Sequence, residues 1–352
     1  MRTVIAAIVI LAATLAVPLS QGTHSASACA GLIGSNGAVN LGQTTTLAAY
    51  HDGVEHYVTA FQFLGGGGQF GTLIPLPDIP TNVERGGDWT LQRLERETTP
   101  QPQFASDEFA DVPAAALKGV EVISTTRIDA LDLTVLKGGG ADVAVWAQDH
   151  GFSLSPDAPE VLDFYAQRSP VFLAAVFDSN AAAQRGQQIG DGTPVHLTIP
   201  TDNPWVPLRI LGLGKQPSDT VRADVFLLTD KKPALLPQSG AGLTLAHDSP
   251  ATDLLLSDLR ADAGMGWIPQ SAWLTKLEVD AATSDLKYDL AIDASGANNP
   301  SLADAGFQLP GFEVPVSASG GVNWALWFWL AAATALAAGI VAGRGVPGEQ
   351  RR

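Results

Sequence analysis

The chain has 352 residues, and its formal net charge of −16 excludes a surface built to bind the phosphates of nucleic acids. Hydrophobic residues make up 46% of the sequence and charged residues 16%, which excludes a wholly disordered chain and allows a sizeable core. Cys29 is the only cysteine, so an intrachain disulfide is excluded and the core alone must stabilise the fold.

Residues 1–28 have the pattern of a secretory signal peptide. Arg2 supplies a positive charge, an apolar run follows, and Ala26-Ser27-Ala28 forms an A-x-A cleavage site. Cleavage there would make Cys29 the first residue of the mature chain, where a bacterial lipoprotein carries its lipid. A lipoprotein signal normally has leucine three residues before that cysteine, and this chain has alanine. We therefore favour an unmodified Cys29, with lipidation of Cys29 as the alternative.

The first part of the mature chain predicts a three-stranded meander. Residues 44–50 and 54–63 are rich in threonine, β-branched and aromatic residues, and Asp52-Gly53 between them is a type I′ turn signal. Four glycines, Gly65–Gly68, then turn the chain into a third strand, 70–76. We expect the three strands to be neighbours in one sheet.

The rest of the domain mixes strands and helices without regular βαβ alternation. Predicted strands are 120–126, 131–136, 171–177, 195–199, 205–211, 221–228, 273–279 and 287–292. Predicted helices are 89–97 with Asp88 as N-cap, 141–150, 155–165 and 252–260. This order favours an α+β fold, a mostly antiparallel β ectodomain with a few short helices. Residues 29–293 form this β-rich extracytoplasmic domain, with two subdomains split near residue 118 as an alternative.

The C-terminal segments predict a membrane anchor. Residues 294–322 are rich in Gly, Pro, Asn and Ser and are read as a stalk. Residues 323–343 carry no charge and have the length of one transmembrane helix. Tryptophans at its start and arginines in the tail 344–352 place that tail in the cytoplasm. Gly339 and Gly343 form a G-x-x-x-G pair for transmembrane packing, with an anchor that has no helical partner as the favoured reading.

The predicted hairpin turn carries the candidate metal ligands, His51 and His56. A two-residue loop places both imidazoles on one face of the sheet, diagonal to one another. Glu55 then points to the other face, which leaves two ligands where zinc takes three or four. Solvated turn histidines are the favoured reading. No cofactor is predicted.

Other polar patterns do not identify a reaction. Asp285, Asp289 and Asp293 are spaced four residues apart but lack the pattern of a calcium loop, so we expect an acidic surface. The G-x-S-x-G, H-E-x-x-H and Walker motifs are absent from the sequence. Asp248 and Ser249 lie beside His247 in sequence but are not expected to form a triad with it, because the members of a catalytic triad meet through the fold. The sequence therefore assigns no catalytic residue.

Several stretches carry a resemblance to a known family. They are Ala28–Gly31, Gly65–Gly68 with Thr72–Pro77, Val135 through Trp146, Gly151, Pro156, Tyr165 and Val171 to Phe177, then Pro194–Pro200 and Pro204–Arg209. In these stretches the chain resembles the bacterial family known as domain of unknown function 2330, over most of residues 28–230. The resemblance implies an exported, often membrane-anchored protein, and it supplies no catalytic residues.

Together these features predict a membrane-anchored protein of the bacterial cell surface, single-pass in the cytoplasmic membrane with its N-terminal domain outside. We expect a non-enzymatic binding or interaction module whose partners are the lipid bilayer and a membrane protein or envelope polymer, not nucleic acid. The alternative is an extracellular hydrolase whose site is assembled from distant residues. A third reading is a metal-responsive sensor that uses His51 and His56.

Overall fold

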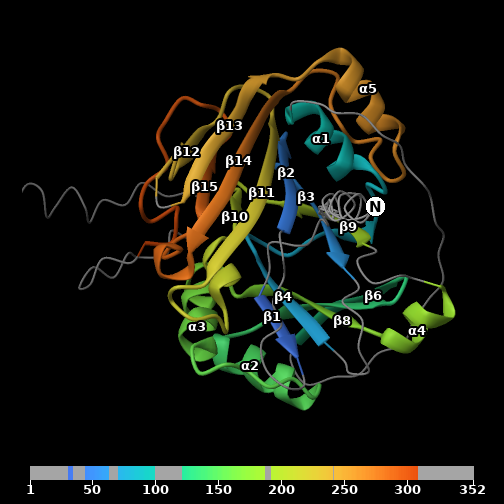
Figure 1. Ribbon diagram of the computed structural model, residues 1–352, viewed down its shortest axis with the longest axis vertical. Helices are drawn as coiled ribbons and strands as arrows, with labels where there is room; N and C mark the ends of the chain where they lie inside the picture. Colours follow the sequence, from blue (N-terminus) through green and yellow to red (C-terminus); the bar gives the residue numbers. More distant parts are fainter. Residues whose placement is uncertain are drawn as a thin grey trace, which may run out of the picture. The chain divides into compact units, whose positions relative to one another are not determined.

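The computed structural model describes residues 31–34, 44–62, 70–99, 121–186, 192–240 and 242–307 (Figure 1). All of them fall within one structural unit. Several predictions fall outside the described residues: the signal peptide, Cys29, the transmembrane helix with Gly339 and Gly343, and the tail. Among the helices of the described part, none has the length and apolar character that a membrane span requires.

The strands form three sheets, in which neighbouring strands are mostly antiparallel. The seven-stranded sheet has the spatial order β13 (Leu243–Pro250), β14 (Trp273–Ala282), β11 (Thr220–Thr229), β2 (Thr44–His51), β3 (Val54–Gln62), β9 (Gly192–Pro200) and β5 (Asn82–Arg85). The five-stranded sheet has the order β1 (Gly31–Gly34), β4 (Phe70–Leu76), β8 (Val171–Phe177), β7 (Leu131–Lys137) and β6 (Glu121–Ile128). A small sheet contains β10 (Trp205–Val206), β15 (Leu290–Asp293) and β12 (Ala234–Leu236). Among the described strands, β2 and β11 are the parallel pair.

Short helices cover the outer faces of the two large sheets. They are α1 (Thr90–Thr98), α2 (Gly140–Asp149), α3 (Ala158–Arg168) and α5 (Asp253–Ala261). Helix α4 (Ser179–Gln184) instead packs Ala182 against the core between the sheets, and the described chain also has 3-10 turns η1 (Arg209–Gly212) and η2 (Thr283–Asp285). Figure 1 shows α1 and α5 on one side of the β layers and α2 and α3 on the other. The fold class predicted from the sequence, α+β with mostly antiparallel strands and a few short helices, is confirmed for the described residues.

Three hydrophobic clusters define the order of these layers. The largest lies between the two large sheets and joins Tyr57 of β3 to Leu173 of β8. A second cluster packs α2 and α3, through Trp146 among others, on the outer face of the five-stranded sheet. The third packs α1 and α5 on the outer face of the seven-stranded sheet, through Leu94 and Leu259. The layers therefore run helices, sheet, sheet, helices.

Strand β3 shows how one strand serves two of these layers. Successive side chains of a strand point to opposite faces. Tyr57 belongs to the cluster between the sheets, whereas Val58 belongs to the cluster beneath α1 and α5. By the same alternation Glu55 faces the space between the sheets and His56 faces the helices. Two polar residues that are adjacent in sequence therefore lie in different environments.

The predicted hairpin is present, but the predicted meander is wrong. β2 and β3 pair through a turn in which Asp52 and Gly53 have φ of 49° and 77°, as a type I′ turn requires. β4, the third expected strand, pairs with β1 and β8 in the other large sheet. The free edge of β3 is taken by β9 instead. Local sequence identifies strands, but it does not say which distant strand pairs with each edge.

The starts of two helices differ from the prediction, and at α1 a tertiary contact replaces the local cap. Asp88 does not cap α1; it pairs with Arg85. The carboxylate of Asp262, far along the chain, accepts from the Trp89 amide at 3.0 Å and from Thr90 Oγ1 at 2.7 Å. Helix α3 begins at Ala158, three residues after the predicted start. Similarly, the strand predicted over 205–211 covers two residues before the chain turns into η1.

The predicted domain boundaries also change. β3 and β4 precede residue 118, yet they pair with β9 and β8, which follow it, so a split near 118 does not match the strand pairing. The stalk was expected to begin at 294, but Ala305 is fully buried and its carbonyl accepts from the Asp289 amide at 3.0 Å. Residues 294–307 therefore belong to the domain; the remainder of the predicted stalk lies outside the described residues. The strands β1, β5, β12 and β13 and the helix α4 were not predicted.

Candidate functional site

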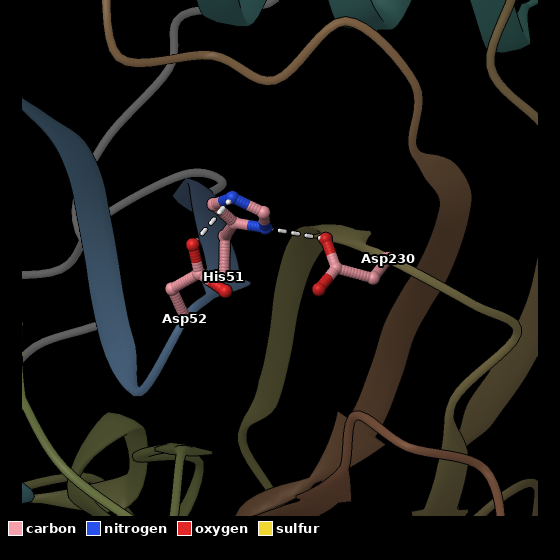
Figure 2. Close-up of side chains that lie close together, drawn as sticks. All are labelled: His51, Asp52 and Asp230. Atoms are coloured by element: carbon pink, nitrogen blue, oxygen red, sulfur yellow. Dashed lines mark hydrogen bonds and ion pairs between the residues drawn. The ribbon is translucent and has the colours of Figure 1, made fainter.

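His51 and Asp230 meet at the end of the parallel strand pair. β2 and β11 run in the same direction with Tyr50 beside Thr229, so both chains leave the sheet at the same edge. His51 Nδ1 lies 2.5 Å from Asp230 Oδ1, and His51 Nε2 lies 3.1 Å from Asp52 Oδ2 on the hairpin turn (Figure 2). The Asp52 side chain is 86% exposed and that of His51 41% exposed, so the group is open to solvent.

This edge offers the donor set of a divalent metal ion. One imidazole nitrogen and one oxygen from each of Asp52 and Asp230 lie within 4.8 Å of one another. Zinc and other first-row divalent ions accept this mixture of nitrogen and carboxylate oxygen, whereas calcium takes six to eight oxygens. In the present arrangement the His51 ring bridges the two aspartates, so a bound ion would replace the ring proton on one side.

His56, the second predicted ligand, belongs to another cluster. The predicted register is correct, since His56 lies opposite Ala49, but the His56 ring contacts different partners. His56 Nδ1 lies 2.8 Å from His196 Nε2, and His196 Nδ1 lies 3.2 Å from Glu84 Oε1. The Trp267 ring stacks on His56 with centroids 3.9 Å apart and planes 3° apart. The structure therefore gives His51 and His56 separate partners.

Proton positions in this second cluster follow from the carboxylate. An ionised Glu84 can only accept, so His196 donates from Nδ1 and keeps Nε2 as an acceptor. His56 then donates from Nδ1 to His196 and is left with a lone pair on Nε2. Burial, together with the repulsion of a protonated His196 or His51, lowers the pKa of His56 to about 4. Burial also lowers the pKa of His196, against the opposing effect of Glu84. Both rings are neutral at pH 7.

A third polar cluster is buried beside the space between the sheets. Asp289, expected on an acidic surface, is fully buried. Its carboxylate accepts from Tyr165 Oη at 2.7 Å, from Arg168 Nη1 at 2.6 Å, and from the Leu208 and Arg209 amides at 2.9 and 3.1 Å. The expectation of an acidic surface fails here because one buried arginine and three further donors satisfy this carboxylate.

Glu55 lies near this third cluster and has no comparable set of partners. It is fully buried, and neither carboxyl oxygen makes a hydrogen bond of normal geometry among the described residues, although the Trp205 amide lies close enough to interact with it. Burial raises the pKa of Glu55 to about 8; the Trp205 amide and the charge of Arg168 oppose that shift only in part. Glu55 is therefore a neutral carboxylic acid at pH 7.

A serine and a histidine also meet on the edge strand β13. Ser249 Oγ lies 2.9 Å from His247 Nε2. Asp248, the carboxylate between them in sequence, points elsewhere: it pairs with Lys232 and accepts from Trp273 Nε1 at 2.6 Å. The expectation that these three neighbours do not form a triad agrees with this geometry, although a serine–histidine pair is present.

Comparisons with known proteins give a family and no activity. No curated protein sequence matches this chain. Among solved structures, a mutated baculovirus P35 after caspase cleavage covers 71% of this chain and 99% of its own, with 8% identity and a TM-score of 0.38. Baculovirus P35 itself covers 72% of this chain and 96% of its own, with 9% identity and a TM-score of 0.37. A likeness at this level supports no argument about function.

A family match is more informative, because it covers most of the domain described above. Residues 23–290 match the family described as "Uncharacterized protein conserved in bacteria", DUF2330. The matched range includes every residue named above in the three polar clusters, from His51 to Asp289. It agrees with the resemblance seen in the sequence. The chain therefore belongs to the bacterial family DUF2330.

Proposed function

We propose that this chain is a membrane-anchored binding module of the bacterial envelope that holds a divalent metal ion at His51, Asp52 and Asp230. The observation that carries the proposal is the meeting of three ligand atoms within 4.8 Å at an exposed edge of the sheet. A net charge of −16 supports it, because an acidic surface raises the local concentration of cations.

The chemistry of the three ligands restricts which metal ion can bind and suggests the role of that ion. One nitrogen and two oxygens suit Zn²⁺ or Mn²⁺ better than Ca²⁺, which does not select imidazole. Three protein ligands leave at least one coordination position open. A donor group of an envelope polymer or of a membrane protein would fill that position. The metal would then connect the module to its partner.

Calorimetric titration of the full-length chain in detergent tests the metal site. We expect one Zn²⁺ or Mn²⁺ to bind per chain and Ca²⁺ to bind more weakly. His51→Ala should weaken binding by at least about 10- to 100-fold, since even outer-shell partners have effects of that size. His247→Ala, at a histidine of the edge strand β13 whose ring contacts Ser249 and is not among the three ligands, is the matched control and should bind as the unaltered chain does. Equal affinity in His51→Ala would exclude this site.

The location in the envelope is a second part of the proposal. It rests on the signal-peptide pattern of residues 1–28 and on the uncharged segment 323–343, followed by arginines. Alkaline extraction of membranes should leave the protein in the pellet, and deletion of 323–343 should release it. Protease added to intact spheroplasts should digest the domain but not a tag placed after residue 352. A protected domain would contradict the proposed orientation.

An extracellular hydrolase is the second candidate, and one observation favours it. Ser249 Oγ lies within hydrogen-bonding distance of the His247 ring, and a serine activated by imidazole is the nucleophile of many acyl-transfer enzymes. A fluorophosphonate probe distinguishes the two functions. Labelling that is lost in both Ser249→Ala and His247→Ala would support the hydrolase. An unlabelled, folded chain would exclude this serine as the nucleophile.

A further inference from the structure

Lys276 on β14 is a buried amine surrounded by carboxylates. Its side chain is only 5% exposed, and that of Asp224 on β11 is 4% exposed. Lys276 Nζ lies 3.3 Å from Asp224 Oδ1, 3.1 Å from Glu95 Oε2 and 3.2 Å from Glu278 Oε1. By contrast, Lys232, which pairs with Asp248, is 57% exposed. Lys276 is therefore buried together with its carboxylate partner Asp224, whereas the side chain of Lys232 is mostly exposed to solvent.

The strand register keeps the amine and this carboxyl group in fixed positions. Lys276 lies directly opposite Phe226, and Asp224 lies opposite Glu278, so Lys276 reaches Asp224 diagonally across the two strands. The Phe226 ring, which is fully buried, has its centroid 5.5 Å from Lys276 Nζ. Two strands that pair over ten residues allow little relative motion. Such fixed proximity gives intramolecular reactions very large effective concentrations.

We propose that Lys276 and Asp224 form an intramolecular isopeptide bond that joins β14 covalently to β11. The Lys276 amine attacks Cγ of the Asp224 carboxyl group, and a new N–C bond forms. One C–O bond of Asp224 then breaks, and its oxygen leaves as water. An ammonium and a carboxylate are consumed, and one amide and one water molecule are produced, so no oxidant, reductant or further reactant is needed.

Glu95 of α1 is positioned to move the protons of this reaction. Its Oε2 lies 3.1 Å from Lys276 Nζ, so it can take a proton from the ammonium and deliver one to the departing oxygen. Burial and the charge of Asp224 raise the pKa of Glu95, which favours its protonated form. Burial lowers the pKa of Lys276, but the charges of Asp224 and Glu95 raise it by more, so the resting amine is an ammonium. Attack therefore requires that a neighbouring carboxylate first take one of its protons. Transfer within the cluster leaves its net charge unchanged.

An amide between Lys276 and Asp224 would give the fold a covalent cross-link, which its cysteine content does not allow. With Cys29 as the only cysteine, no disulfide can join two parts of this chain. A covalent bond between distant residues stabilises a fold mainly by restricting the unfolded chain. The Lys276–Asp224 amide would do this for the central and outer strands of the seven-stranded sheet, and reducing agents would not break it.

Intact-mass spectrometry of the purified, folded full-length chain tests the proposal. We expect the measured mass to be lower, by one water molecule, than the mass calculated for an unlinked chain with the same first and last residues. Proteolysis should yield a branched peptide that joins the Lys276 segment to the Asp224 segment. Lys276→Arg, which keeps a cation among the carboxylates and so protects folding, should have its full calculated mass. Lys232→Arg is the matched control and should still lose one water.

Two further variants identify the residues that react. Asp224→Asn can form the same amide by releasing ammonia, so its final mass should equal that of the cross-linked unaltered chain. Glu95→Gln should slow the reaction and leave a mixture of linked and unlinked chains in freshly made protein. The full calculated mass in the folded, unaltered chain would overturn the proposal. A loss of water that persists in Lys276→Arg would also overturn it.

Discussion

Glu55 and His56 are neighbours in the chain, yet their side chains lie on opposite faces of one sheet. Glu55 points between the two sheets, is fully buried, and has a pKa raised to about 8. His56 points toward the helices, stacks on Trp267, and has a pKa lowered to about 4. Burial is the main cause of both shifts, because it disfavours whichever form carries the charge. An acid and a base are therefore both neutral at pH 7, for one physical reason.

These opposite shifts make the stability of the fold depend on pH in opposite directions. Glu55 favours the folded chain most below its ordinary pKa of 4.5, and this contribution is lost as the pH rises through 8. His56 favours the folded chain above its ordinary pKa of 6.5, and this contribution is lost as the pH falls through 4. Replacing each residue by a neutral side chain separates the two effects.

Glu55→Gln should give the largest change. Between pH 4.5 and 8 the unaltered chain loses roughly 4–5 kcal/mol of unfolding free energy through this residue, and the variant should not. Urea unfolding at pH 5 and pH 9, compared between the two chains, measures the difference. Glu160→Gln, at a side chain 69% exposed, is the control and should follow the unaltered chain. If the difference in unfolding free energy between Glu55→Gln and the unaltered chain were the same at both pH values, Glu55 would not be a buried, neutral acid.

Asp289→Ala should destabilise the fold by about 3–5 kcal/mol, because Arg168 would keep a buried charge without its carboxylate. This change also affects Glu55, because Arg168 would no longer face the charge of Asp289 and would stabilise the ionised form of Glu55 more strongly, so the pKa of Glu55 should fall. Denaturant unfolding measures the first effect, and repeating it across pH measures the second. Asp285→Ala, at an exposed aspartate of the same segment, should stay within about 0.5 kcal/mol of the unaltered chain.

His56→Phe tests the other face of the sheet. Phenylalanine keeps an aromatic ring against Trp267 but cannot be protonated. From pH 6.5 down to pH 4 the unaltered chain should lose roughly 1–2 kcal/mol through His56, a figure reduced for its partial exposure. Thermal melting at pH 7 and pH 4.5 should show a smaller acid loss in the variant. Equal losses in the two chains would place the acid sensitivity elsewhere.

Asp262→Ala should give the smallest effect, about 1 kcal/mol, because it removes a cap from the start of α1 on the helix-covered face. Asp88→Ala is its counterpart, since Asp88 is the residue that local sequence assigned to this cap. Thermal melting of both variants decides between them. If Asp88→Ala proved the more destabilising, the cap would be local after all.

Local patterns were sufficient for features that depend on neighbouring residues. Asp52-Gly53 predicted the hairpin and its register, and the period of two correctly placed Glu55 and His56 on opposite faces. Thr252 was expected at the start of a helix, and its hydroxyl accepts from the Leu255 amide in α5. Each of these rests on one to four consecutive residues, and at none of them did a distant residue replace the local contact, as Asp262 did at the start of α1.

The clusters themselves could not be read from the sequence. Asp230 lies 179 residues after His51, and only the parallel pairing of their strands brings them together. His196 reaches His56 in the same way, through the pairing of β3 with β9. Asp289 looked like one of three surface carboxylates because nothing in its own segment reveals Arg168. The sequence shows the type of each side chain in these clusters, but the residues that contact it depend on the order of the strands in the sheets.

The parallel pairing of β2 with β11 has a consequence for how the chain folds. β2 occupies residues 44–51, and its neighbour β11 begins only at residue 220. A chain synthesised from its N-terminus therefore exposes the hairpin of β2 and β3 long before that edge can be covered. Contacts between such distant residues slow folding and leave strand edges open to association with other chains. Fragments that end before β11 should consequently aggregate rather than fold.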